Sequence, residues 1–312
     1  MIRLGLSLLL RAVFVLFGAA FATFTLLWQA PGDPALAIAM ARFDAVVSED
    51  VIAFVRAEAG LDTGFWSAFQ AWLAPMLVGD FGKSSVTGRA VWPDLASAIA
   101  YTVPLALAGL AIGVAVAVPL ALCAARNQGG WLDRLAIALA SLGAAIPAYW
   151  LGLLLILLFA VTFAWLPAMG ARTPAHLLLP ALTLGLGVAA ALTRILRSGL
   201  LEARAQPFLP AFRHRGVPGF AIGRDHIAPH AAIPVITVFG LELAFLLEGA
   251  VMVEVIFARP GLGNFLVHAI EARDFPKVQA VVIITALLFV IINLLIDIVY
   301  RLIDPRIGQR HA

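Results

Sequence analysis

The chain has 312 residues, of which 62% are hydrophobic and 12% are charged, and its mean hydropathy is +1.00. A soluble domain carries about 25% charged residues, so a water-facing surface is excluded for most of this chain. The net charge of +3 is too small and too scattered for a nucleic-acid-binding surface. The single Cys123 excludes an intramolecular disulfide and zinc sites built on cysteine pairs. This composition is typical of an integral membrane protein.

Six segments are apolar enough to cross a bilayer core of about 30 Å, which takes about 20 helical residues. In chain order they cover residues 13–28, 101–123, 135–163, 177–196, 233–257 and 278–300. The sequence therefore predicts an all-α polytopic bundle of six transmembrane helices. The first segment follows Arg3, as the apolar part of a signal peptide would. It is long for such a region, and no small-x-small cleavage site precedes Pro31, so we expect a retained helix.

The distribution of Lys and Arg indicates the orientation, because short cytoplasmic loops are enriched in both. With both termini in the cytoplasm, the inside connections hold thirteen cations and four acids, and the outside connections hold eight cations and ten acids. We therefore expect cytoplasmic N- and C-termini. Residues 29–100 then form an external segment with amphipathic stretches at 47–59 and 66–77, and residues 197–230 form the largest cytoplasmic loop. The expected divisions are 1–100 (first helix and external segment), 101–304 (five-helix core) and 305–312 (cytoplasmic tail).

Two short patterns resemble ligand sites but do not meet their requirements. The Gly-Lys-Ser of residues 82–84 resembles the end of a phosphate-binding loop, but the glycine required five positions before it is Leu77. His226 and His230 have the i, i+4 spacing of a helical metal pair, yet no Glu lies between them and Pro229 disrupts a helix. Packing within the loop is therefore favoured over metal binding. No catalytic set shares a plausible pocket, so we expect no cofactor, no metal and no enzymatic activity.

Three carboxylates lie inside the fifth segment, at Glu242, Glu248 and Glu254. Each six-residue step turns a helix by about 240°, so the three side chains point to different faces. An acid in a membrane span is costly and is a functional candidate by default. We expect Glu248 and Glu254 on the translocation pathway or at an interface with another subunit. The alternatives are a hydrogen bond within the bundle for Glu248, and an interfacial pair with Arg259 for Glu254.

The order of short motifs along the chain is the most specific signal in the sequence. The motifs are Ala30-Pro31-Gly32-Asp33-Pro34, Gly79-Asp80-Phe81-Gly82-Lys83-Ser84, Arg194-x-x-Arg197-Ser198-x-x-Leu201-Glu202, His226-Ile227-Ala228-Pro229-His230-Ala231-Ala232-Ile233-Pro234, Glu254-Val255-Ile256-Phe257-Ala258-Arg259-Pro260-Gly261-Leu262-Gly263, Arg273-Asp274-Phe275-Pro276 and Asp304-Pro305-Arg306-Ile307. From end to end the chain resembles the inner-membrane permease of bacterial dipeptide/oligopeptide/nickel-type ABC importers. The resemblance is to the subunit that carries the Pro-Gly-Asp-Pro element.

The resemblance implies a type I importer permease, which translocates solute and does not hydrolyse ATP. Its implied partners are a second homologous permease, two cytoplasmic ATPase subunits, an extracytoplasmic substrate-binding protein and the lipid bilayer of the cytoplasmic membrane. The implied function is translocation of a small peptide-like solute by alternating access, driven by the partner ATPases. Import of nickel or of a metal–metallophore complex stays an alternative, because related permeases carry such solutes too.

The cytoplasmic loop is similar to the family's coupling loop, whose short helix sits in a cleft of the ATPase. By motif position this helix is expected at residues 207–215, before a glycine with positive φ. The candidate coupling residues are Phe208, Phe212, Arg213, Arg215 and Gly216. The family usually has an acid where Pro207 stands, a basic residue where Pro210 stands and a small residue where Phe212 stands. It also more often has a small or neutral residue at the position of Glu248.

Two other classes of membrane protein compete with this interpretation. An ion-coupled secondary transporter would show inverted repeats with interrupted helices at matching positions. No such symmetry is apparent, and the basic loop between the fourth and fifth segments is asymmetric. An intramembrane enzyme would need a paired catalytic set, which the sequence does not provide.

Overall fold

The computed structural model describes residues 2–29, 31–43, 47–58, 60 and 62–303. The regular structure in these ranges is helical, apart from one isolated bridge between Lys83 and Ala90. Among the described residues, five helices are long and apolar enough to cross a membrane, and a bent pair of helices makes a sixth candidate. The predicted all-α polytopic fold is confirmed. The predicted tail, 305–312, lies outside the described residues.

The chain divides into two compact units. The first comprises Met1–Tyr101 and Pro260–Ile291, and the second comprises Thr102–Arg259 and Ile292–Ala312. The helices of the first unit are α1 (Ile2–Trp28), α2 (Pro34–Phe43), α3 (Glu49–Glu58), α4 (Phe65–Met76), the start of α5 (Val91–Arg126), α12 (Leu262–Glu271) and most of α13 (Phe275–Ile303). Those of the second are the rest of α5, α6 (Trp131–Ala145), α7 (Ala148–Leu155), the π-helix η1 (Ile156–Thr162), α8 (Ala175–Arg204), α9 (Leu209–His214), α10 (Gly219–Ile222), the π-helix η2 (Gly223–Ile227) and α11 (Ala228–Ile256).

In the first unit, three short helices follow α1, where the sequence predicted two amphipathic stretches. Helices α3 and α4 match those stretches, and α2 is additional. The carboxylate of Asp33 caps α2 by accepting a hydrogen bond from the backbone N–H of Ala35 at 3.0 Å. Helix α4 packs on α1 through aromatic rings, with the Phe24 and Phe69 centroids 5.3 Å apart. Helices α2, α3 and α4 are therefore part of the folded first unit.

In the second unit, α5, α8 and α11 share one apolar core that includes Leu105, Leu184 and Val253. Glycines allow α5 and α8 to approach closely. A Cβ atom added at Gly185 would lie 2.7 Å from the carbonyl oxygen of Gly109, closer than real side chains come. Small residues at helix contacts have this effect in membrane proteins, where close van der Waals packing holds spans together.

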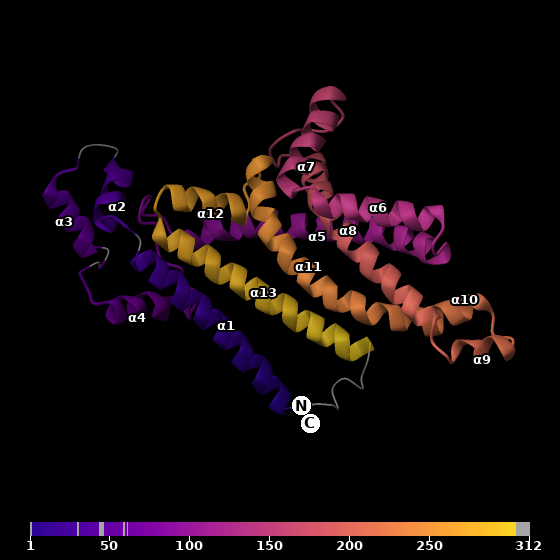
Figure 1. Ribbon diagram of the computed structural model, residues 1–312. Helices are drawn as coiled ribbons and strands as arrows, with labels where there is room; N and C mark the ends of the chain where they lie inside the picture. Colours follow the sequence, from indigo (N-terminus) through magenta and orange to yellow (C-terminus); the bar gives the residue numbers. More distant parts are fainter. Residues whose placement is uncertain (1, 30, 44–46, 59, 61, 304–312) are drawn as a thin grey trace. The chain divides into compact units, whose positions relative to one another are not determined.

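The third predicted segment, 135–163, is bent and not straight. The helix axis bends by 102° at Ile146 and Pro147, between α6 and the helical segment formed by α7 and η1. Proline disfavours helical backbone in the residue before it, and Ile146 accordingly has an extended conformation with ψ at 121°. The predicted segment 135–163 contains Pro147, but no end of the helix was predicted there. Helix α6 ends at Ala145. Figure 1 shows α7 turning away from the axis of α6.

Candidate functional site

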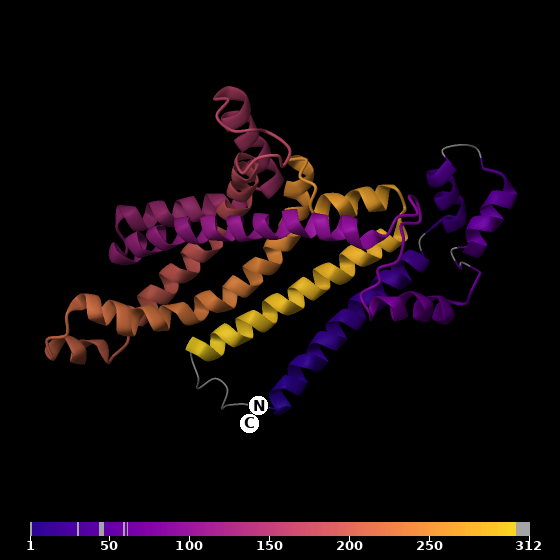
Figure 2. The same cartoon turned by 180° about the vertical axis from the view of Figure 1, so that it is seen from behind.

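The short helix predicted in the cytoplasmic loop is present as α9 (Leu209–His214). Both views of the structure place α9 and α10 beyond the end of α8 and the start of α11 (Figures 1 and 2). Pro210 is the second residue of α9, where a missing N–H costs nothing because the first-turn donors have no helical acceptor. Pro207 lies in the turn before the helix. The helix is therefore present but shorter than the predicted 207–215: it begins after Pro207 and holds Pro210 in its first turn.

Gly216 ends this helix in the left-handed conformation, with φ at +75°. The N–H of Val217 reaches back to the carbonyl of Phe212 at 3.1 Å, which is the longer bond of a Schellman C-cap. A Cβ at Gly216 would meet no atom within 4 Å. Glycine is therefore required here by backbone conformation and not by space. The Arg215 side chain is exposed, and that of Arg213 lies outside what the structure describes.

Aromatic and histidine rings attach α9 to the helix that follows the loop. The ring of Phe212 stacks on His226, with centroids 4.0 Å apart and planes inclined by 23°. The Phe208 ring lies 5.5 Å from that of His230, and His230 Nδ1 lies 2.8 Å from the carbonyl oxygen of His226. We call these four residues the ring cluster. It supports the packing interpretation of the two histidines, and no group of three metal-ligating side chains occurs among the described residues.

The end of α8 that leads into α9 is held by an ion pair. The Arg197 guanidinium donates to both carboxylate oxygens of Asp133, at 2.5 and 2.7 Å. Asp133 is only 2% exposed, and it also accepts a hydrogen bond from the Gly129 N–H at 2.8 Å. About two turns further along α8, the Arg204 side chain donates to the carbonyl of Ala125. Helix α8 is thus bonded to the C-terminal end of α5 and to the first turn of α6.

The three acids of α11 have three different surroundings, as their spacing predicted. The Glu242 side chain is half-buried. The Glu248 side chain is exposed on the surface of the chain. Glu254 is fully buried, and its carboxylate accepts a hydrogen bond from the Thr102 hydroxyl at 2.6 Å. The backbone N–H of Arg259 also donates to the Glu254 carbonyl, at 2.8 Å. A role of Glu254 on the pathway or at a permease interface stays a prediction.

In the first unit, two motifs that lie 190 residues apart in sequence meet at a buried carboxylate. The hydroxyl of Ser84 donates to Asp274 at 2.5 Å, and the N–H of Ser85 donates to the same carboxylate at 3.0 Å. Ser84 and Asp274 are 1% and 2% exposed. The Gly-Lys-Ser triplet therefore serves packing between the two motifs. The Pro-Gly-Asp-Pro element is tied separately, through an ion pair of 2.6 Å between Asp33 and Arg56.

Comparison with known proteins decides the family. The model of a family described as binding-protein-dependent transport system inner membrane component matches residues 117–309, which is more than half of the chain. The chain belongs to this family. The matched part includes α8, the ring cluster, α11 and α13.

Relatives of full length agree with this assignment. The glutathione transport system permease protein GsiC of Salmonella typhimurium (strain LT2) is 37% identical over 310 residues, covering 99% of this chain and 100% of the relative. The protein of the same name from Escherichia coli (strain K12) is 36% identical over the same coverage. The chain is thus an ABC importer permease of the dipeptide/oligopeptide type and a multi-pass inner-membrane protein. Its relatives are permease components and not catalytic subunits.

Solved structures show the same fold at low sequence identity. An inward-facing structure of the MetNI methionine ABC transporter has a TM-score of 0.57 and 19% identity, and the match covers 67% of this chain and 96% of that one. An amino acid ABC transporter crystallised with histidines has a TM-score of 0.51 and 19% identity, covering 67% and 94%. These matches support the importer permease fold predicted from the motifs.

Sequence reasoning missed the contacts that hold α8 and α9 in place. Asp133 was one of four acids on the predicted cytoplasmic side, and Arg197 stood in a family motif, but nothing paired them. The i, i+4 spacing of His226 and His230 was noticed, whereas their aromatic partners were not. Asp274 belonged to a motif without a predicted contact. In each case the missing information was a partner far away in the sequence.

Proposed function

We propose that this chain is the translocation subunit of an ATP-driven importer that moves a small peptide-like solute across the cytoplasmic membrane by alternating access. The observation that carries the proposal is the full-length similarity to glutathione permeases, because glutathione is itself a small peptide. This similarity favours a peptide-like solute over nickel or a metallophore. ATP hydrolysis is supplied by two partner ATPases, and a substrate-binding protein delivers the solute from outside. A second, homologous permease completes the pathway.

We assign coupling to α9 and the residues around it, Phe208, Phe212, Arg213, Arg215 and Gly216. The support is a set of contacts that connect α9 and the helix before it to neighbouring helices. The ring cluster joins α9 to α11, and the ion pair of Arg197 with Asp133 anchors the helix that precedes α9. A displacement of α9 by an ATPase is thereby passed to two spanning helices at once.

We also propose that the surface of α11 around Glu248 faces the second permease or the aqueous pathway. The large apolar side chains exposed on the same stripe are Leu241, Phe245, Met252 and Val255. Together with Glu248 they are spaced by four, three, four and three residues, the period with which one helix packs along another. A carboxylate facing lipid costs at least about 2.5–3.5 kcal/mol near mid-membrane. Cover by protein or water removes that cost.

The test of coupling compares two glycines of the same loop. Gly216→Val forces a β-branched residue into the left-handed region, at a cost of about 1–2 kcal/mol. Gly223→Val is the control, because Gly223 has φ of −60° and equal open space. In vesicles that contain the complete transporter, Gly216→Val should assemble with its partners but lose the stimulation of ATP hydrolysis by loaded binding protein, whereas Gly223→Val should keep it. Equal stimulation in both variants would remove α9 from the coupling mechanism.

A further inference from the structure

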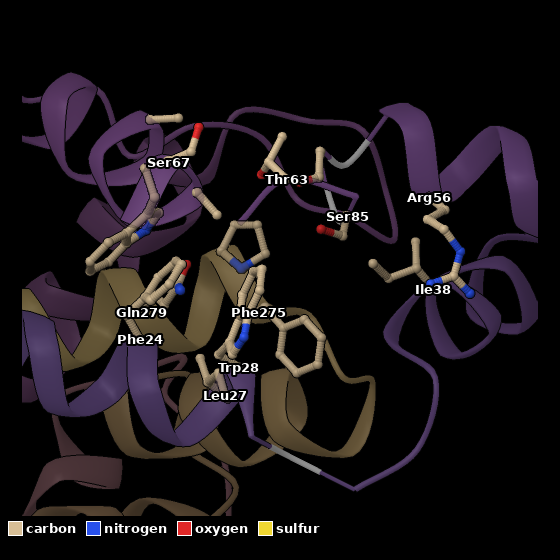
Figure 3. Close-up of a pocket in the computed structure, with 15 residues that line it drawn as sticks. Phe24, Leu27, Trp28, Ile38, Arg56, Thr63, Ser67, Ser85, Phe275 and Gln279 are labelled. Atoms are coloured by element: carbon tan, nitrogen blue, oxygen red, sulfur yellow. Dashed lines mark hydrogen bonds between the residues drawn. The ribbon is translucent and has the colours of Figure 1, made fainter. Parts of the chain in front are cut away.

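The first unit contains a cavity of about 520 Å³ that the proposed function does not use (Figure 3). It lies between the C-terminal end of α1, helix α4 and the N-terminal start of α13. Its walls are mostly aromatic and apolar, and they include Phe24, Trp28, Trp72 and Phe275. We call it the aromatic cavity. Its volume is in the range of sites that enclose small organic ligands, about 300–1,000 Å³.

One polar group of this cavity has no partner. The indole Nε1 of Trp72 is buried and meets no hydrogen-bond acceptor in the described part of the chain. Buried donors are nearly always bonded, because an unbonded one has lost its water without replacement. Trp72 also lines the aromatic cavity, so an occupant with an acceptor oxygen satisfies this donor when the indole ring turns toward it. Gln279, which is 6% exposed, is a second polar side chain of the wall.

A smaller cavity of about 230 Å³ adjoins the first and shares Leu27 and Phe275 with it. Its wall includes Gly32 and the exposed Arg273. A Cβ at Gly32 would lie 3.3 Å from a guanidinium nitrogen of Arg273, so this cation lies against the Pro-Gly-Asp-Pro element. Among the described residues, no carboxylate lies within ion-pair distance of Arg273, in contrast to Arg56, which is paired with Asp33.

The charged side chains that line the two cavities are positive. Their described wall residues include the cations Arg56 and Arg273 and no acidic side chain. Because Arg56 is paired with Asp33, the uncompensated charge is that of Arg273. Both cavities lie beside the C-terminal end of α1 and the N-terminal end of α13. Both of these helices are apolar enough to span the membrane. Trp28 and Trp72 are typical of that depth, at which tryptophan lies between hydrocarbon and headgroups. An uncompensated cation beside an apolar wall matches the chemistry of an amphipathic anion from the bilayer.

We propose that the two cavities bind one anionic phospholipid. An acyl chain fills the aromatic cavity, an ester carbonyl accepts the hydrogen bond of Trp72, and the phosphate lies beside Arg273. The bound lipid fixes α4 and the Pro-Gly-Asp-Pro element against the ends of α1 and α13. This site is separate from the transported solute and needs only that α1 and α13 span the membrane.

The test uses the full chain in nanodiscs made from equal amounts of phosphatidylglycerol and phosphatidylcholine with identical acyl chains. Native mass spectrometry after release from the discs should show one retained phosphatidylglycerol per chain. Trp72→Phe removes the N–H donor together with one ring of the indole and should lower the retained lipid about three- to tenfold, at least the effect of one hydrogen bond. Trp66→Phe is the matched control, because Trp66 lies on the same helix, is 63% exposed and lines neither cavity.

Two further variants test the headgroup and the acyl chain separately. Arg273→Gln should abolish the preference for phosphatidylglycerol, whereas Arg89→Gln, at an exposed arginine outside both cavities, should not. Ala68→Phe fills the aromatic cavity from α4 and should exclude both lipids. Equal retention of the two lipids by the unaltered chain, or equal loss in Trp72→Phe and Trp66→Phe, would overturn the proposal. So would a lipid-free chain whose tryptophan fluorescence responds to an added peptide, since the cavity would then be a peptide site.

Discussion

Asp133 and Arg197 form a largely buried ion pair near the C-terminal end of α8. Its geometry determines how much stability is lost when one partner is removed. Both carboxylate oxygens are bonded to the guanidinium, and the side chains are 4% and 20% exposed. Removing one partner leaves the other charge away from water without compensation, which costs about 3–5 kcal/mol in buried pairs. Removing both partners is far less damaging.

Asp133→Asn should therefore destabilise the protein by about 3 kcal/mol, the lower end of that range because Arg197 is partly exposed. The measurement is thermal unfolding of the purified protein in detergent. Adding Arg197→Met to Asp133→Asn should recover most of the loss, since no charge is then left unpaired. Asp225→Asn is the control, because its pair with Arg224 is exposed, and it should leave the melting temperature unchanged. A melting temperature as high as wild type in Asp133→Asn would show that the pair does not hold α8.

Helix α11 exposes a regular stripe of side chains that the described part of the chain does not cover. Its exposed stripe of Leu241, Phe245, Glu248, Met252 and Val255 has the spacing of a helix-packing seam. Glu248 lies in the middle of this seam and has two alternative roles. An anion on the pathway acts through its charge, whereas a hydrogen bond between permeases needs only the polar atoms.

Glu248→Gln and Glu248→Leu distinguish the two roles. If Glu248 acts as an anion on the pathway, Glu248→Gln should impair uptake of an amine-bearing substrate while the complex still assembles. If it bonds the second permease, Glu248→Gln should be tolerated and Glu248→Leu should weaken co-purification of the two permeases. Met252→Leu, a change on the same stripe that keeps its apolar character, is the control for both measurements. Wild-type uptake and assembly in both Glu248 variants would exclude Glu248 from the mechanism.

The comparison of sequence with structure shows which elements composition determines and which depend on distant contacts. Long apolar runs predicted the spanning helices, because crossing a bilayer leaves little choice of structure. The same reasoning missed the break at Pro147 and placed the start of α5 at residue 101, whereas it begins at Val91. The helix α9 and the positive φ of Gly216 were predicted from the family resemblance. The ring cluster and the contact of Ser84 with Asp274 were not, since neither spacing nor propensity encodes a partner many residues away.

For the whole molecule, the proposed orientation has both termini in the cytoplasm. Ser67 and Arg215 are both exposed on this chain, so neither position lies in its core. After Cys123→Ser, the Ser67→Cys variant should react with a membrane-impermeant thiol reagent in intact cells, and Arg215→Cys should react only after lysis. The reverse pattern would contradict both the orientation and the assignment of α9 to ATPase coupling.

The central claim is that this chain translocates solute only when partner subunits hydrolyse ATP. Its most direct test is uptake of labelled glutathione and dipeptides into vesicles that hold both permeases and both ATPases, with ATP trapped inside and binding protein outside. Uptake should require ATP and should stop when the ATPases are replaced by variants that bind but do not hydrolyse it. Uptake by this chain alone, or uptake driven by an ion gradient without ATP, would contradict the account.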